Sequence, residues 1–144
     1  MDFVTSIRYL GTTIESNPGF TFSSAPDLQS FYRSVNSILN VIKKPDDITQ
    51  MHLLFANCVP FLSYVSAVKE YPSWEMLDCN TAVNDAIRKV FSFHRWESVR
   101  ELRNGFGYKS LTEIFVNAKE KFQRSLGTHV NPILSHLCRI NSLD

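Results

Sequence analysis

The sequence has 144 residues, of which 44% are hydrophobic and 20% are charged. This balance excludes an intrinsically disordered chain and fits one globular domain of ordinary size. The formal net charge of +1 does not by itself imply a polyanionic partner.

Residues 1–23 are predicted to form a small β-hairpin or a pair of short strands. β-Branched and aromatic residues occur on both sides of Gly11, and a turn cluster at residues 16–19 precedes the sequence Phe20-Thr21-Phe22. Two strands alone are marginally stable in water, so this element needs a helix or a further sheet beside it.

From Pro26 onward the chain is predicted to be helical. The first amphipathic helix begins at Pro26 or Asp27 and is stopped by Pro45. Further helices after the central one are predicted at residues 73–91, 96–103, 110–127 and 131–140.

The central helix is predicted at residues 48–68, with Leu54 and Leu62 fully buried. Apolar residues on nearly all its faces fit either a protein interior or a membrane span. Polar residues within the segment and amphipathic helices around it favour the interior, so we expect no membrane association. Pro60 removes a backbone donor and clashes with the preceding turn, which predicts a kink or break within residues 57–61.

Helix-capping signals support these boundaries. Ser73 is the expected cap of the helix that follows the central one, and Asn104-Gly105 is the expected left-handed end of the short helix after that. Ser110 and Glu113 form a predicted capping box. The fold class is therefore mainly α: a helical bundle of about six helices in one compact unit, residues 24–144, behind a small N-terminal β-hairpin.

Motifs for catalysis, metal binding or cofactor binding are absent from the sequence. The three cysteines, Cys58, Cys79 and Cys138, have no zinc-ligand spacing and are expected to be free thiols in a reducing compartment. The N-terminus has no signal-peptide pattern, so the expected location is cytoplasmic or nuclear. Asp46-Asp47 could suggest a two-metal site, but its place after Pro45 favours a helix N-cap.

Several residues allow a functional and a structural interpretation. His94 and Glu97 could perform acid–base chemistry, but an inter-helix turn in which Trp96 anchors the core is favoured. Aromatic residues that could stack on bases are more simply interpreted as core residues because of their helical spacing. These residues are Tyr64, Tyr71 and Trp74.

The clearest functional signal is a basic segment, residues 88–124, which holds nine Lys/Arg and four Glu and so has a balance of +5. Lysine and arginine neutralise phosphates and give sequence-independent affinity for nucleic acid. The alternative is an ordinary solvated helix face. The basic residues are Arg88, Lys89, Arg95, Arg100, Arg103, Lys109, Lys119, Lys121 and Arg124.

Short motifs occur in three stretches of the sequence, at residues 3–11, 58–64 and 80–98. Together they resemble reverse transcriptases of non-LTR (LINE-type) retrotransposons. Residues 3–11 resemble the "K/R-Y-L-G" strand of the primer-grip region, and residues 58–64 resemble the "P-x-L-x-Y-G-x-E-x-W" segment of the thumb. Residues 80–98 resemble the "N-x-A-x-R-x-I-F…W-x-S" helix and turn that follow. The resemblance covers roughly residues 3–126, but the chain departs from the family where the family has Gly, Glu and Trp. The residues at these positions are Val65, Ala67 and Lys69.

The resemblance implies a primer-grip-like element followed by a thumb-like domain. The metal-binding aspartates of the family precede this strand, so we expect a non-catalytic protein that performs no polymerisation. Its implied role is to bind a primer–template or other nucleic-acid duplex through the backbone. The implied contacts are Arg8 and Tyr9 at the primer grip and Arg88, Lys89, Arg95, Arg100 and Arg103 on phosphates. The alternative is a domesticated protein-interaction module that does not bind nucleic acid.

Overall fold

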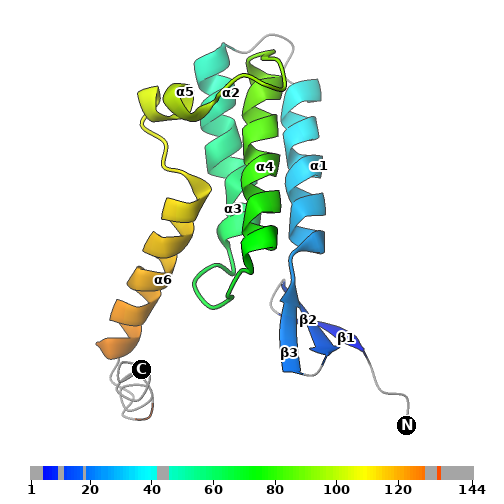
Figure 1. The fold of residues 1–144 in the computed structure, drawn as a ribbon, viewed down its shortest axis with the longest axis vertical. Coiled ribbons are helices and arrows are strands. Elements are labelled where there is room, and N and C mark those ends of the chain that lie inside the picture. Colours follow the sequence, from blue (N-terminus) through cyan, green and yellow to red (C-terminus); the bar gives the residue numbers. More distant parts are fainter. Residues whose placement is uncertain (1–4, 10–11, 18, 42–45, 129–132, 134–144) are drawn as a thin grey trace.

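A small antiparallel sheet is followed by a mainly helical bundle in the computed structural model (Figure 1). The structure describes residues 5–9, 12–17, 19–41, 46–128 and 133. Across these residues there are five helices, when the interrupted central helix is counted once. The predicted fold class is confirmed, while the expected last helix at residues 131–140 lies outside the described residues.

The N-terminal sheet contains β1 (Ser6–Tyr9), β2 (Thr12–Asn17) and β3 (Gly19–Ser23) in the order β1-β2-β3. Ile7 pairs with Ile14, which in turn pairs with Phe22. The segment after the predicted turn cluster therefore adds a third strand to the expected hairpin. Ser24 alone separates β3 from α1 (Ala25–Val41), so the sheet is directly continuous with the bundle.

The central helix is interrupted by a wider turn. Its parts are α2 (Asp47–Leu53), the π-helical turn η1 (Leu54–Cys58) and α3 (Val59–Ser63). The N–H of Val59 donates to the carbonyl of Leu54, five residues earlier, so an extra residue is accommodated immediately before Pro60. The predicted interruption is confirmed, but it lies at Leu54–Cys58, mostly before the expected range of residues 57–61.

Burial along the central helix is one-sided. Leu54 and Leu62 are each 1% exposed, as predicted, whereas Ile48 is 64% exposed and Phe61 is 44% exposed. The expectation of a helix covered on all faces is therefore wrong. Within the described ranges, no helix has the length and apolar character that crossing a membrane requires.

The core lies between α1, the interrupted helix and α4 (Ser73–Val90), which stand side by side in Figure 1. The largest fully buried side chains are Phe31, Val35, Met51, Leu54, Cys58, Leu62, Cys79, Ile87 and Leu111. Cys58 and Cys79 are free thiols, while Cys138 lies outside the described residues. Burial raises the pKa of the Cys79 thiol to about 11, which keeps this thiol protonated at neutral pH.

α6 (Leu111–Gly127) packs on the bundle through its first half. Leu111 and Phe115 are buried, and the ring of Phe115 lies 4.6 Å from that of Tyr71. Beyond Ala118 the helix is almost entirely exposed, and Figure 1 shows it diverging from the other helices.

Two of the three predicted N-caps are confirmed and one is wrong. Asp46 accepts a hydrogen bond from the N–H of Thr49 (3.2 Å), and Ser110 accepts one from the N–H of Glu113 (3.2 Å). These hydrogen bonds satisfy N–H groups that have no partner within the helix. Ser73 is the first residue of α4 rather than its cap, because Pro72 occupies the N-cap position.

The short helix α5 (Arg100–Gly105) begins later than predicted. Trp96 precedes it and is 80% exposed, so the expectation that Trp96 anchors the core is wrong. The left-handed residue that follows α5 is Gly107, with φ of 75°, and not Gly105. Tyr64 and Trp74 are likewise exposed rather than in the core.

Candidate functional site

The residues predicted to contact nucleic acid fall into two groups at opposite ends of the bundle (Figure 1). Arg8 and Tyr9 lie on β1. The sheet adjoins the N-terminal end of α4, because the hydroxyl of Ser24 donates to the carboxylate of Glu75 in the first turn of α4 (2.8 Å). Arg88 lies in the last turn of α4, roughly 20 Å away along a helix that rises about 1.5 Å per residue.

The second group is concentrated around the C-terminal end of α4. It comprises Arg88 and Lys89 in the last turn of α4, Arg95 in the following loop, and Arg100 and Arg103 on α5. We call these five residues the basic patch.

A reversal of the chain brings Arg95 back beside α4. Ser92 has a left-handed backbone with φ of 54°. The N–H of Phe93 donates to the carbonyl of Arg88 (2.9 Å), and that of Ser92 to the carbonyl of Lys89 (3.4 Å). This pair of bonds is a Schellman motif, which ends the helix and redirects the chain.

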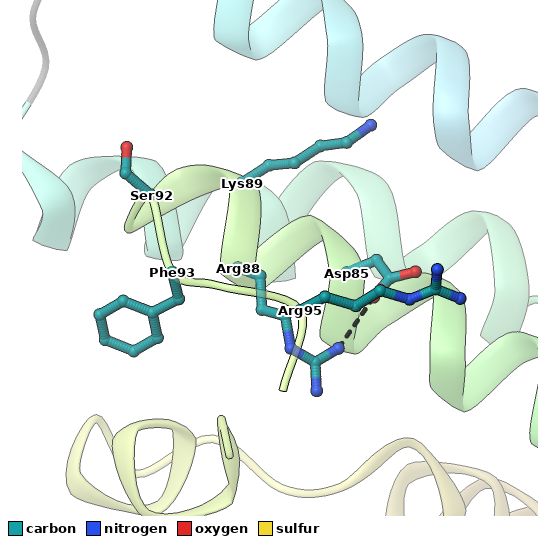
Figure 2. A pocket seen from close by; sticks show the side chains of 6 residues that line it. All are labelled: Asp85, Arg88, Lys89, Ser92, Phe93 and Arg95. Carbon is teal, nitrogen blue, oxygen red and sulfur yellow. Dashed lines mark hydrogen bonds and ion pairs between the residues drawn. The ribbon is translucent and has the colours of Figure 1, made fainter. Parts of the chain in front are cut away.

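An open hollow of about 470 Å³ lies at this reversal. It is lined by Asp85, Arg88, Lys89, Ser92, Phe93 and Arg95. Figure 2 shows Arg95 extended over the same side of α4 as Arg88 and Asp85, while Lys89 is directed away. The lining carries three cations and one carboxylate, which favours an anionic ligand.

Arg88 holds the loop rather than presenting a free charge. Its Nη1 lies 2.8 Å from the carboxylate of Asp85, and its Nε donates to the carbonyl of Glu97 (3.1 Å). Its side chain is 20% exposed. The Asp85–Arg88 pair has the spacing of facing residues on a helix, a signal that was present in the sequence.

The other cations of the basic patch differ in their exposure. Lys89, Arg95 and Arg100 are exposed and have no acidic partner within 4 Å among the described residues. Arg103 is half-buried, and its Nε is buried without a hydrogen-bond partner in the described part of the chain. The three exposed cations are therefore the ones available to a ligand.

Two cations outside the basic patch are neutralised locally. Lys119 pairs with Glu70 (2.8 Å) and Arg124 with Glu120 (3.3 Å). The Lys119 ammonium holds the pKa of the Glu70 carboxyl below its usual range through a hydrogen bond and its charge. The basic segment is thus divided into a patch around α4 and α5 and a partly paired face of α6.

The turn at residues 94–97 is closed by hydrogen bonds and carries exposed rings. The N–H of Glu97 donates to the carbonyl of His94 (3.1 Å), and the N–H of His94 donates to the carboxylate of Glu97. The carboxylate is therefore used to close the turn. The rings of His94 and Trp96 are stacked at 4.7 Å with an interplanar angle of 4°.

Arg8 lies at a separate hollow of about 340 Å³, lined by Arg8, Asp27, Ser30, Asn57, Pro60, Phe61 and Tyr64. Burial raises the pKa of the Asp27 carboxyl, against the opposing effects of the Lys69 and Arg8 charges. Tyr9 is 61% exposed on β1. The structure therefore does not join Arg8 and Tyr9 to the basic patch.

A buried ion pair between Lys69 and Glu75 was not anticipated from the sequence. The Nζ of Lys69 lies 2.9 Å from Oε2 of Glu75 and donates to Oε1 (3.1 Å), and their side chains are 2% and 8% exposed. The same ammonium lies 4.4 Å from the ring centre of Tyr71. Lysine and glutamate are almost never buried unless they are paired, as they are here.

Metal ligands do not converge in the described residues: they contain no group of three or more His, Cys, Asp or Glu placed to hold a metal ion. No protein-family model, curated protein or solved structure matches the chain. The basic patch is therefore interpreted from its own geometry.

Proposed function

We propose that this protein binds nucleic acid through the sugar–phosphate backbone, without sequence preference, at the basic patch. The observation that supports the proposal most strongly is the gathering of cations from the last turn of α4 and the following loop around one hollow, with the exposed Arg100 next in the chain at the start of α5. Lys89, Arg95 and Arg100 provide the phosphate contacts. The resemblance to the end of a LINE-type reverse transcriptase supports a primer–template or other duplex as the ligand.

Backbone binding follows from the charge of the ligand. Each phosphate that a lysine or arginine neutralises releases a condensed counterion, so affinity falls as salt rises. Lys89, Arg95 and Arg100 are exposed and form no ion pair within 4 Å among the described residues, so they meet a phosphate without first breaking one. Arg88, bound to Asp85 and to the loop, acts by positioning Arg95.

A salt titration of duplex binding tests the proposal. We expect the triple variant Lys89→Gln, Arg95→Gln, Arg100→Gln to bind duplex DNA more weakly. Its log–log salt slope should become shallower by about 0.9 for each phosphate that the variant no longer neutralises, or nearly three in total. Labelled duplex and fluorescence anisotropy between low and moderate salt provide the measurement.

A matched control removes the same charge elsewhere. The variant Lys119→Gln, Lys121→Gln, Arg124→Gln alters three cations on α6 and should leave most of the slope intact. Equal effects of the two triple variants would show a general charge effect and contradict binding at the basic patch. Absence of wild-type binding at low salt would contradict the proposal as well. Arg8→Gln tests whether the duplex also reaches the sheet.

A second candidate function is protein interaction. Apolar side chains are exposed on α3 and the turn after it and on the first turns of α4. They are Phe61, Tyr64, Val68, Trp74 and Leu77. Apolar surface of this kind is a common feature of protein contacts. This candidate becomes the leading one if duplex binding is absent.

A further inference from the structure

His94 and Trp96 form an exposed aromatic platform that the fold does not use. Trp96 is 80% exposed, and its ring is stacked in parallel on the ring of His94. A tryptophan usually contributes large buried area to a core or an interface. Here one ring is held flat on another, at a place where it contributes little to the burial of the core.

The platform is held in place by the turn beneath it. Hydrogen bonds between His94 and Glu97 close the turn, and Arg88 binds the carbonyl of Glu97 and so joins the turn to α4. Such preorganisation lowers the entropy lost when a ligand binds. The rings are therefore presented on a loop that hydrogen bonds close and join to α4.

The platform adjoins the basic patch in the sequence. Arg95 lies between His94 and Trp96 in the chain and lines the hollow with Arg88 and Lys89 (Figure 2). Proteins bind single-stranded nucleic acid with aromatic side chains that stack on the bases and with nearby cations that contact the phosphates, since every base has a flat face and every phosphodiester carries a charge. In a duplex, the faces of internal bases are already covered by their neighbours.

We propose that the basic patch takes an unpaired segment of nucleic acid, with a base stacked on Trp96 and the adjoining phosphate on Arg95. Single strands, or single-stranded overhangs beside a duplex, are then preferred over blunt duplexes. This inference rests on the proposed nucleic-acid binding and specifies the part of the ligand that is recognised. Both DNA and RNA offer the required faces and charges.

Intrinsic fluorescence tests the inference directly, because the chain has two tryptophans, Trp74 and Trp96. The variant Trp74→Phe leaves Trp96 as the sole tryptophan, and Trp96→Phe leaves Trp74. We expect oligo-dT and oligo-U to quench the fluorescence of the first variant and not that of the second. A blunt duplex should produce less quenching at equal occupancy, measured by anisotropy of a labelled strand.

Affinity provides the second measurement. Removal of the stacking of one base corresponds to a roughly 5- to 150-fold weaker single-strand affinity for Trp96→Ala. Trp74→Ala, at the far end of α4, is the matched control and should leave the affinity unchanged. Trp96 is exposed, so its removal should leave the fold intact, which circular dichroism verifies.

The outcomes separate this inference from the proposed function. If oligonucleotides bind but Trp96 is not quenched and Trp96→Ala binds as tightly as wild type, the stacking platform is wrong and backbone binding stands. If a blunt duplex binds as well as a single strand, the preference is wrong. If no nucleic acid binds at low salt, both proposals fail.

Discussion

Ser92 ends α4 in a backbone conformation that residues with a Cβ atom rarely adopt. Its φ of 54° lies in the left-handed region. For such a residue this conformation costs about 1–2 kcal/mol, a cost that glycine avoids. Gly107 occupies the equivalent position after α5, where the N–H of Tyr108 donates to the carbonyl of Arg103 (3.1 Å). The two helices thus end in the same motif with different residues.

We expect Ser92→Gly to raise the free energy of unfolding by about 0.5–1 kcal/mol, since the greater freedom of glycine in the unfolded chain offsets part of the gain. Gly107→Ala should lower it by about 1 kcal/mol for the backbone alone, because an added Cβ would meet no atom within 4 Å. Urea unfolding measures both. A decrease of stability in Ser92→Gly would show that the serine side chain contributes something else.

Whether a given aromatic side chain is buried or exposed was the least predictable feature of the sequence. Trp74 and Trp96 are large aromatic residues of the kind usually found in a core, yet both are exposed. Burial of a residue depends on which elements pack against it, and that information is not local. Tyr71, on the other hand, packs against Phe115. The aromatic platform could not have been found without the position of the 94–97 turn.

Elements with strong local signals were predicted well. Asp46 and Ser110 cap their helices as expected, because each acts on an N–H group three residues away. The break at Pro60 follows from the missing N–H of proline. α5 begins later than the sequence predicts, because a helix of six residues has too few turns to show a period. The third strand, Gly19–Ser23, was missed although its run of Phe and Thr directly after a turn cluster is itself a hairpin signal.

The interrupted helix provides the most direct test of the core. Leu62→Ala should lower the free energy of unfolding by about 2–5 kcal/mol, because the side chain is 1% exposed and its removal leaves a cavity. Ile48→Ala, on the exposed side of the same helix, is the control and should change it by less than about 0.5 kcal/mol. Urea unfolding of the wild type and both variants measures these changes in the free energy of unfolding. Equal effects at the two positions would mean that α3 is not packed on the core as described.

For the whole molecule, the buried ion pair is the point at which distant segments meet. Ser24 joins β3 to α1, Lys69 belongs to the loop after α3, and Glu75 lies in the first turn of α4. Their contacts fix the sheet to the base of the bundle. In the sequence, Lys69 is distinguished only as a departure from the reverse transcriptase pattern, and nothing there indicates that it is buried.

A double-mutant cycle tests this contact. Lys69→Met should lower the free energy of unfolding by about 3–5 kcal/mol, because it leaves the Glu75 carboxylate buried without its cation. The double variant Lys69→Met, Glu75→Leu should recover much of this stability, since apolar residues of similar size replace both charges. Additive effects in urea unfolding would show that the two side chains do not interact.

The arrangement of the whole molecule also decides which predicted contacts act together. Arg88, Lys89, Arg95, Arg100 and Arg103 are close in the sequence and gather at one end of the bundle. Arg8 and Tyr9 are placed at the other end by the junction of Ser24 with Glu75. Proximity in the sequence predicted that the first group lies together. Only the packing of the sheet against the bundle shows that Arg8 and Tyr9 lie apart from it.

The wide turn η1 also has a consequence for changes in chain length. It contains one residue more than a regular helix would need to cover the same rise. A one-residue deletion within Leu54–Cys58 would restore regular spacing and leave α2 and α3 in the same relative rotation, because the wide turn already absorbs the extra residue. A one-residue deletion inside the regular helix α4 would instead turn everything beyond it by about 100° and carry one flank of its buried face out of the core. Single-residue deletions should therefore be better tolerated at this turn than within α4.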